Sequence, residues 1–536
     1  MQRSRFLWFI VFAALSCWMH GTAFSQTATD TPLSASTYLG GGGDDVGAAV
    51  AIASDGTVVV GGTFTDLPAP NAESSLLDAD GTSPGAVLRF SADGKTLRSV
   101  TRLGNSVDDL ELDPATDRIA VVGDFGLVVL SPDADQVLWS KSGSGIGDSG
   151  GAEYSAGRRV AVGVDGTLAA LFNRFVWVFD AAGVPASGAA PNGTRLDIAD
   201  TYIDAGLFNK RVEDLAVDDA GGAVIVAGWG QTSAGAQTPS LVAIDVSGTF
   251  GAELWKDYNW WASALNSTSL KADSRMVRVS RGNDGNLYVS GYFDGGNTVF
   301  AKPPKYLDAD SNRTGYSDTS ANNVEIDRWN NGAGANAGAF AWFGRILPEN
   351  GRLDAGHFQY SSTGVNQPSG FSIFALTADS AGATWIGGRS FRDMPNRDDL
   401  AVNGVPIGPR VDNENALIAV SAEFSERLRV ASWTANGGSA SRITAVAVRS
   451  GRVAVLGETE GPIVTASPVD GAKNAGTDVF FAVWGGGSGG LADAIAALQI
   501  LAGISSSSIP EDVDGDGQIG LPEAIFALQV AADHRS

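Results

Sequence analysis

The chain has 536 residues, 69 of them Gly, and its 60 acidic against 36 basic side chains give a formal net charge of −24. A surface this acidic repels nucleic acid and anionic lipid and favours solubility and divalent cations, so nucleic acid is not expected as a partner. The single Cys and three His residues argue against a disulfide framework and against a zinc site built on His.

The N-terminus has the pattern of a secretion signal. Arg3 and Arg5 precede an apolar run that is too short to span a bilayer as a stable helix. Cleavage is expected after Ser25, where small residues occupy the two positions that signal peptidase inspects. Cys17, in a poorly matching lipid-attachment box, gives a lipoprotein alternative. No later stretch is apolar enough for a transmembrane helix, so the signal peptide 1–25 predicts a bacterial protein that is secreted or held at the cell surface.

A repeated phrase runs through the centre of the chain. Each copy has a short apolar strand, a turn of the Asp-Gly or Gly-Asn kind, a second apolar strand and a closing Gly. The β-branched residues and the turn residues that tolerate positive φ are typical of a β-hairpin. The seven copies are 49–63, 109–125, 159–171, 213–229, 277–293, 374–390 and 443–459.

Further apolar strands separate the copies. A third strand follows most of them, and a fourth precedes the next phrase; examples of the third are 86–90, 241–246, 416–421 and 479–484. A hairpin cannot bury both faces alone, so four strands in each of seven units predict a mainly β fold, a seven-bladed β-propeller over residues 26–484. A pair of β-sandwiches or a non-closing β-solenoid is the alternative, because short strands between Gly turns suit both.

The two ends of the predicted propeller complement each other. Residues 34–45 resemble a fourth strand with nothing before it, and 479–484 a third strand with nothing after it. We expect the strand at Thr37–Leu39 to complete the blade that contains Ile443 to Trp484, which closes the ring and removes its open edges. A long insertion at about 294–370, rich in Asn, Asp, Gly and Ser, is predicted to be loop more than strand.

The first copy carries a family resemblance. Residues 36–66 read STYLGGGGDDVGAAVAIASDGTVVVGGTFTD. They resemble the bacterial β-propeller repeats called SBBP repeats, whose units run Tyr-Leu-Gly-Gly, Asp-Asp, a strand, Asp-Gly-Asn and a Val-Gly-Gly/Thr ending. The other copies share only the hairpin pattern. The resemblance implies a secreted propeller and no defined activity.

A different kind of sequence follows the Gly/Ser linker 485–490. LADAIAALQILAG (491–503) and LPEAIFALQVAAD (521–533) align residue for residue, and both have apolar residues at helical spacing. Two amphipathic helices that bury their faces against each other are therefore predicted.

The second of these helices is preceded by DVDGDGQIGLPE, which has the pattern of an EF-hand-type calcium loop. Such a loop supplies oxygen ligands from carboxylates at positions 1, 3 and 5, a backbone carbonyl at position 7 and a bidentate Glu at position 12, with Gly517 at the sharp turn. An acidic turn that caps a helix is the alternative. The predicted ligands are Asp512, Asp514, Asp516, Gln518 through its carbonyl, and Glu523.

The duplication of loop and helix resembles dockerin repeats and the dockerin-like tails of other bacterial exoproteins. In that family two loops bind two calcium ions and the paired helices form a docking face. Here the loop expected at 482–493 keeps only one carboxylate, at Asp493, so residues 491–536 are predicted to bind one Ca²⁺. The resemblance implies a docking protein as the partner of the paired helices, although the missing loop departs from the pattern of cohesin-binding dockerins. Asp308, Asp310 and Asn312 have the spacing of a second calcium loop. This site is the weaker candidate, because no Gly occupies the sixth position of the loop.

No catalytic set can be assigned from the sequence. A Ser-His-Asp triad would have to be built on His357, and 60 acidic residues guarantee accidental carboxylate pairs. No cofactor fingerprint is present. The segment Asn259-Trp260-Trp261, with two adjacent aromatic residues, is a candidate for contact with a carbohydrate or peptide.

Two functions therefore remain. The preferred one is a secreted, calcium-binding propeller that acts as a non-catalytic binding or adhesion scaffold, with a calcium-stabilised C-terminal module for docking or anchoring. The alternative is an extracellular polysaccharide hydrolase or lyase. Carboxylates and aromatic residues at the mouth of the central channel would favour the enzyme, and Gly and Ala there would favour the binding protein.

Overall fold

The computed structural model describes most of residues 30–485 and, beyond them, position 521. The predicted signal peptide 1–25 and, apart from Leu521, the predicted module 491–536 lie outside the described residues. Within the described range the longest gaps are 142–157, 187–194, 258–272, 294–323 and 326–339.

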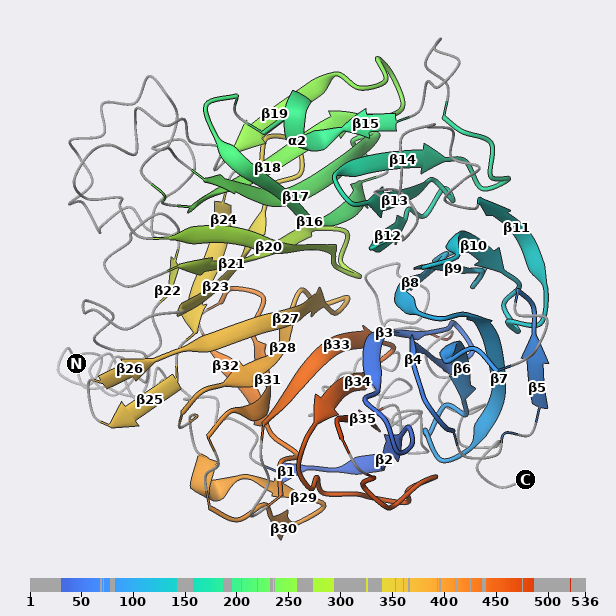
Figure 1. Cartoon of the computed structure of the whole chain (residues 1–536). Coiled ribbons are helices and arrows are strands. Elements are labelled where there is room, and N and C mark those ends of the chain that lie inside the picture. The colour runs from blue at the N-terminus through green and yellow to red at the C-terminus, as the bar shows by residue number, and fades with distance from the viewer. Residues whose placement is uncertain are drawn as a thin grey trace, which may run out of the picture.

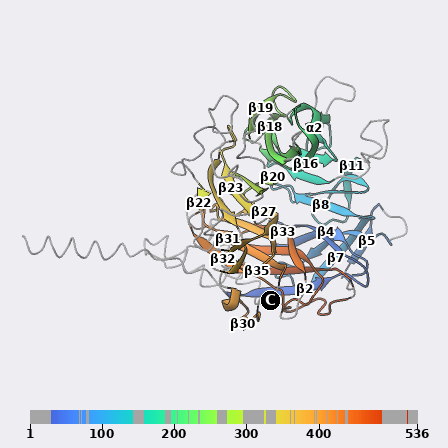
Figure 2. The same ribbon diagram turned by 60° about the vertical axis from the view of Figure 1, so that its left-hand side comes forward.

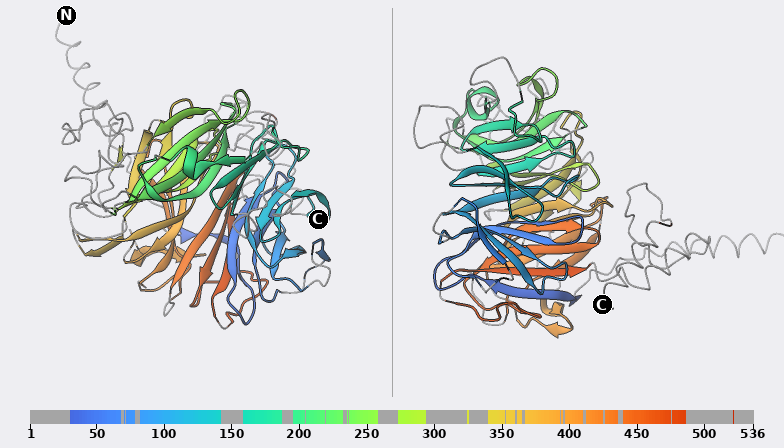
Figure 3. Two further views of the ribbon diagram at one scale, coloured as in Figure 1. Left: turned by 45° about the horizontal axis from the view of Figure 1, so that its top comes forward. Right: turned by 90° about the vertical axis from the view of Figure 1, so that its right-hand side faces the viewer.

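Seven sheets of four antiparallel strands, two of them extended by a fifth strand that pairs parallel, stand around a central axis (Figure 1). The turned views show neighbouring sheets packed face to face (Figure 2 and Figure 3). The innermost strands are β3 (Val46–Ile52), β8 (Val107–Leu112), β12 (Arg159–Val162), β16 (Phe208–Asp218), β20 (Ser274–Arg281), β27 (Phe371–Ala378) and β33 (Ser441–Arg449). Each sheet is named below by its innermost strand.

The outer strands follow in the same blade order. The second strands are β4 (Val58–Thr63), β9 (Ile119–Gly123), β13 (Leu168–Phe172), β17 (Ala223–Gln231), β21 (Leu287–Phe293), β28 (Thr384–Ser390) and β34 (Arg452–Thr459). The third strands are β6 (Gly85–Phe90), β10 (Gly126–Leu130), β14 (Phe175–Phe179), β18 (Gln237–Asp245), β23 (Phe340–Ile346), β31 (Glu414–Val420) and β35 (Asp478–Gly485). The fourth strands are β7 (Leu97–Gly104), β11 (Val137–Lys141), β15 (Arg195–Asp197), β19 (Glu253–Asp257), β24 (Leu353–Gln359), β32 (Arg427–Ala431) and β2 (Leu33–Leu39).

The repeated phrase is the hairpin formed by the first two strands of each sheet, as predicted. In the first copy the turn between β3 and β4 places Gly56 at φ 81°, and the Asp55 carboxylate accepts hydrogen bonds from the backbone N–H and the hydroxyl of Thr57. Asp-Gly therefore supplies both the positive φ and the local hydrogen bonds that the tight turn needs.

The closing Gly of the phrase faces a β-bulge. Six of the seven innermost strands show a register shift near their start, and β12 does not. A Cβ atom at Gly388 would lie 2.0 Å from the carbonyl oxygen of Ser372, and one at Gly457 would lie 2.4 Å from that of Arg442. The bulged backbone leaves no room for a side chain there, which explains the Gly.

The ring is closed by the N-terminal strand, and this prediction is confirmed. β2 pairs antiparallel with β35, with Thr37 opposite Phe481 and Leu39 opposite Val479. The Tyr38 hydroxyl also accepts a hydrogen bond of 2.7 Å from the backbone N–H of Ile463. The start of the described chain therefore covers the edge that β35 would otherwise leave open.

The predicted fold class is wrong in two respects. An eighth sheet of three strands, β1 (Asp30–Thr31), β29 (Ala401–Val402) and β30 (Val405–Pro406), lies at the rim, where no sheet was predicted. The described residues also contain only one short α-helix, α2 (Ile198–Thr201), with a 3₁₀ turn at Arg397–Asp399, and no α-helical EF-hand module. The described fold is thus a mainly β propeller with eight sheets of three or more strands, in place of seven blades followed by a helical module.

The predicted insertion at 294–370 also needs correction. It contains β23 and β24, which are the third and fourth strands of the β20 sheet. It also holds the short β22 (Val324–Glu325), which pairs with β24, and the hairpin of β25 (Ser361–Gly364) and β26 (Gln367–Ser369). In a similar way β5 (Ala72–Ser75) extends the β3 sheet. The apolar run of β23, buried almost throughout, is a strand despite the Gly-rich and Asn-rich sequence around it.

The core lies between neighbouring sheets. Phe90 of the β3 sheet stacks on Phe481 of the β33 sheet with 4.6 Å between ring centroids, and both side chains are fully buried. Among the described residues, no helix is long and apolar enough to cross a membrane.

Candidate functional site: the central channel

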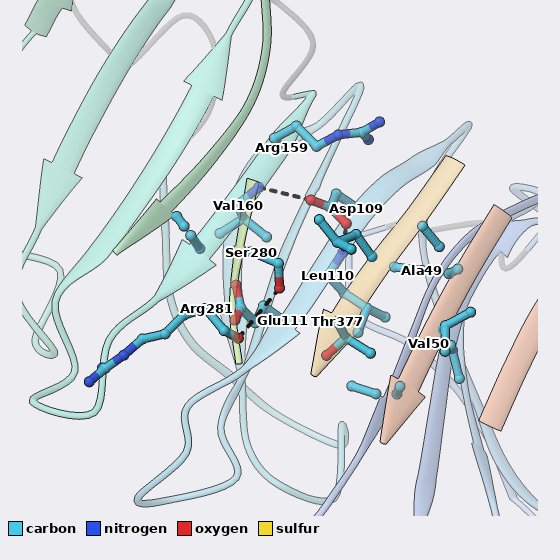
Figure 4. Close-up of a pocket in the computed structure, with 18 of the residues that line it drawn as sticks. Ala49, Val50, Asp109, Leu110, Glu111, Arg159, Val160, Ser280, Arg281 and Thr377 are labelled. Atoms are coloured by element: carbon cyan, nitrogen blue, oxygen red, sulfur yellow. Dashed lines mark hydrogen bonds between the residues drawn. The ribbon is translucent and has the colours of Figure 1, made fainter. Parts of the chain in front are cut away.

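The innermost strands of all seven sheets line a cavity of about 350 Å³ on the axis of the ring (Figure 4). One residue of each strand pairs with the second strand at the equivalent register position, which lies next to the bulge in every innermost strand except β12. All seven line the cavity, and we call them the channel ring: Ala49, Asp109, Arg159, Asp214, Arg278, Ala375 and Ala445.

The channel ring has a charged half and an alanine half. Four consecutive strands, β8, β12, β16 and β20, contribute Asp109, Arg159, Asp214 and Arg278, so that negative and positive side chains alternate. The other three strands, β27, β33 and β3, contribute only alanines to the same level. The central cavity is therefore lined by charged side chains on one side and by small apolar side chains on the other.

The carboxylates of the charged half bind the backbone of the next sheet. Asp109 accepts a hydrogen bond of 3.0 Å from the backbone N–H of Val160, and Asp214 accepts one of 3.2 Å from that of Val279. One step further along β8, Glu111 accepts a bond of 3.2 Å from the N–H of Val162. An innermost strand has a free edge, and these carboxylates satisfy its N–H groups from the preceding sheet.

The arginines bind carbonyl oxygens and the acidic side chains between them. The Arg159 Nε atom lies 3.6 Å from Asp214 Oδ1, and its guanidinium also donates to the carbonyl of Asp108 at 3.4 Å. Arg278 Nε donates to the carbonyl oxygen of Phe374 in the next sheet at 2.6 Å. Each charged side chain thus links two sheets across the channel wall.

Burial shifts the protonation equilibria of this half. Burial, reinforced by nearby Asp214, raises the pKa of Asp109 to about 6 despite Arg159 and the Val160 N–H, which favour the charged form. Burial also raises the pKa of Asp214. Burial and the neighbouring Arg159 lower the pKa of Arg278 to about 10. Asp109 therefore changes charge near pH 6, within the range used by acid–base catalysts and by pH-dependent binding sites.

Contacts between sheets also occur at the opposite end of the channel. Arg449, at the end of β33, donates to the carbonyl of Ile52 and to the carboxylate of Asp117, both at 3.2 Å. The same carboxylate accepts a bond of 3.1 Å from the backbone N–H of Ser54. Hydrogen bonds therefore link three sheets at this end of the channel, which differs chemically from the end that carries the channel ring.

None of the residues predicted from the sequence as ligands belongs to this site. The calcium ligands Asp512, Asp514, Asp516, Gln518 and Glu523 lie outside the described residues, as do Asp308, Asp310, Asn312 and the aromatic segment 259–261. His357 is buried on β24 against Phe343, with 5.6 Å between ring centroids, and does not line the cavity. Within the described part of the chain, no group of three or more His, Cys, Asp or Glu residues could hold a metal ion.

Sequence reasoning missed the channel ring, although a signal was present. The four charged residues occupy the first or second position of their repeated phrases, at 109, 159, 214 and 278. Alignment of the phrases by their turns would have placed them in one column, and the innermost strand of a propeller faces the axis. The observed lining matches neither predicted alternative alone, because it combines paired acidic and basic groups with alanines.

Comparison with known proteins gives no family. No protein-family model and no curated protein matches the sequence. Among solved structures, the chain is similar to one entitled "Crystal Structure of Mitotic Checkpoint Complex", with 9% sequence identity and a TM-score of 0.37 over 80% of this chain and 90% of that chain.

Proposed function

We propose that this protein is a binding scaffold without catalytic activity, whose central channel takes a small polar ligand. The observation that carries the proposal is the charged half of the channel ring. Its carboxylates and guanidinium groups are fixed by backbone hydrogen bonds, so they present immobile charges of both signs to the cavity. A volume of about 350 Å³ lies at the lower end of the range for small-molecule sites.

A hydrolase that acts on polysaccharide is the second candidate, and one observation favours it. The pKa of Asp109, raised to about 6, would suit a general acid. A glycosidase also needs a second carboxylate placed as nucleophile or base, and Asp214 is bound instead to the Val279 N–H and lies beside Arg159. The binding function therefore fits the channel better.

Calorimetry together with product analysis distinguishes the two functions. The mature protein is titrated with amino acids, small sugars and short oligosaccharides, and each mixture is also analysed for cleavage products. We expect binding without turnover, and we expect Ala445→Phe to abolish it by filling the cavity, while Ala182→Phe on the exposed surface has no effect. Cleavage of any polymer that is lost in Asp109→Asn would establish the enzyme instead.

Export and calcium binding belong to the same proposal and rest on the sequence alone. We expect one Ca²⁺ at the loop Asp512 to Glu523, in a segment that docks or anchors the propeller outside the cell. Calorimetry of the mature protein should find a single calcium site that Asp512→Ala removes and Asp308→Ala leaves intact. Two equivalent sites, or a site retained in Asp512→Ala, would contradict this assignment.

A further inference from the structure

A polar and aromatic patch lies at one corner of the β16 sheet. Phe208, at the start of β16, is 60% exposed, which is unusual for a large apolar side chain in this structure. Strand register places it opposite Gln231, which in turn lies opposite Gln237 of β18. These three residues and three polar neighbours form a patch that we call the corner platform. It consists of Phe208, Asn209, Arg211, Gln231, Gln237 and Arg275.

The two arginines of the corner platform are held by aromatic rings. The Arg275 guanidinium lies 4.7 Å from the ring centroid of Trp229 and 5.5 Å from that of Tyr292. Arg211 lies 6.0 Å from the same Trp229 ring, and its side chain is exposed. Cation–π contact and a hydrogen bond to Gln237 restrain the Arg275 guanidinium, so less conformational freedom is lost when it binds an oxyanion.

These arginines differ from the basic residues around the rest of the propeller. In a protein with net charge −24, many described arginines have a carboxylate partner, for example Arg102 with Glu73 at 2.8 Å. Arg345 with Asp354 and Arg442 with Glu458 are paired in the same way. Arg211 and Arg275 form no ion pair with any described carboxylate. Among the described residues their positive charge is therefore not balanced by a direct ion pair, which suits an anionic ligand.

The amide side chains of the corner platform are also fixed. Asn209 Nδ2 donates to Gln231 Oε1, and Gln231 Nε2 donates to the carbonyl of Gly235, both at 2.7 Å. Gln237 accepts a hydrogen bond from Arg275 Nε. A side-chain amide offers both donors and acceptors, which matches sugar hydroxyls, since these also act as both.

We propose that the corner platform binds an acidic glycan, a chain of sugars that carry carboxylates. Arg211 and Arg275 bind a carboxylate, the amides bind ring hydroxyls, and the exposed ring of Phe208 covers the apolar face of a sugar. A peptide would be expected to extend a free strand edge, whereas the platform sits at strand ends. The proposal rests on the proposed function only in treating the propeller as a binding scaffold.

The test uses the mature full-length protein and defined oligomers. Oligogalacturonate is titrated by calorimetry at two salt concentrations, with its methyl ester as the uncharged match and oligoglutamate as the peptide arm. We expect oligogalacturonate to bind, at least tenfold more tightly than the ester, with affinity that falls as salt rises. Arg211→Gln and Phe208→Ala should each weaken it about tenfold, a factor that corresponds to ~1.4 kcal/mol.

Matched variants separate the corner platform from other effects. Arg195→Gln removes an arginine stacked on an aromatic ring, Phe175, of another sheet, and should leave the affinity unchanged. Arg211→Lys keeps the charge without the planar fork and should give an intermediate loss, so the outcome does not depend on one variant alone. Thermal melting confirms that each variant is folded.

Three results would overturn the proposal. One is binding of oligogalacturonate that survives both platform variants and disappears in Ala445→Phe, which would place the anion in the channel and leave the proposed function intact. Another is tighter binding of oligoglutamate than of the glycan. The third is the absence of glycan binding while small ligands still occupy the channel.

Discussion

The two halves of the channel ring meet the same structural requirement in different ways. In the charged half, side chains of one sheet cover the free edge of the next, as Asp109 does for Val160 and Asp214 for Val279. In the alanine half, Ala375, Ala445 and Ala49 offer no side-chain hydrogen bond to the next strand, and the sheets are joined by apolar packing and by contacts near the strand ends, for example between Arg449 and the carbonyl of Ile52. Closing the ring therefore does not require charges in the channel.

This difference supports our proposal that the charged half binds a ligand. Burial opposes ionisation in this wall, as the raised pKa of Asp109 and the lowered pKa of Arg278 record, whereas the neighbouring carboxylates raise the pKa of Arg159 despite its burial. Alanines hold the same register position in three other strands without this cost. A fixed array of both charges facing a cavity is what a polar ligand needs.

The largest effect is expected from Asp214→Ala, which breaks the charged half at its centre. The variant leaves Arg159 and Arg278 without the carboxylate between them and deprives the Val279 N–H of its acceptor. We expect urea unfolding to show a loss of about 3 kcal/mol in the free energy of unfolding.

Asp133→Ala is the matched control for that variant. It removes a carboxylate that lies in solvent, 2.9 Å from the largely buried Arg89, and an ion pair with so exposed a partner contributes roughly 1 kcal/mol or less. Equal losses in the two variants would show that the charged half is no more than a set of surface pairs.

A smaller effect is expected from the titration of Asp109. Its pKa is about 6 in the folded protein and about 4 in the unfolded chain, so between these values the folded state holds the extra proton. The contribution of Asp109 to the free energy of unfolding is therefore largest below about pH 4, falls as the pH rises to about 6, and is constant above that pH. Asp109→Asn should remove this pH dependence. The free energy of unfolding of the variant, relative to that of the natural protein, should therefore increase by ~2 kcal/mol between pH 4 and pH 7.

Urea unfolding at a series of pH values measures this difference. The same Asn substitution at the exposed Asp133 supplies the baseline for general effects of pH on the acidic chain. A pH dependence that is identical in the Asp109 variant and the natural protein would mean that the channel hydrates this carboxylate as bulk water does.

Local pattern was enough to predict the hairpins and the closing strand, because alternating apolar residues and Asp-Gly turns act over a few residues. The three-stranded sheet was missed because its strands have only two residues each: β29 and β30 form a short hairpin about Asn403 and Gly404, and β1 joins it from a distant part of the chain. β23 and β24 were missed because polar, Gly-rich sequence surrounds their apolar runs. The calcium loop at Asp512 to Glu523 stays a prediction.

The channel ring shows a different limit of sequence reasoning. Whether Asp109 or Asp108 faces the axis depends on the register shift between Val107 and Asp109, and a bulge moves alternate side chains to the other side of a strand. Charge order could be read along the repeated phrases, but the alternation around the axis emerges only when four sheets are placed side by side.

The smallest and sharpest effect comes from adding one charge to the alanine half. Ala375 is the ring neighbour of Arg278, whereas Ala445 has alanines on both sides, so a new carboxylate finds a counter-charge only at position 375. Ala375→Asn and Ala445→Asn correct for volume and polarity, because Asn is nearly isosteric with Asp. We expect the change from Asn to Asp to lower the free energy of unfolding by about 1 kcal/mol less at position 375 than at position 445, as measured by urea unfolding at pH 7. The same cost at both positions would show that the charges of one half do not reach the next strand, and the two halves would then be independent of each other.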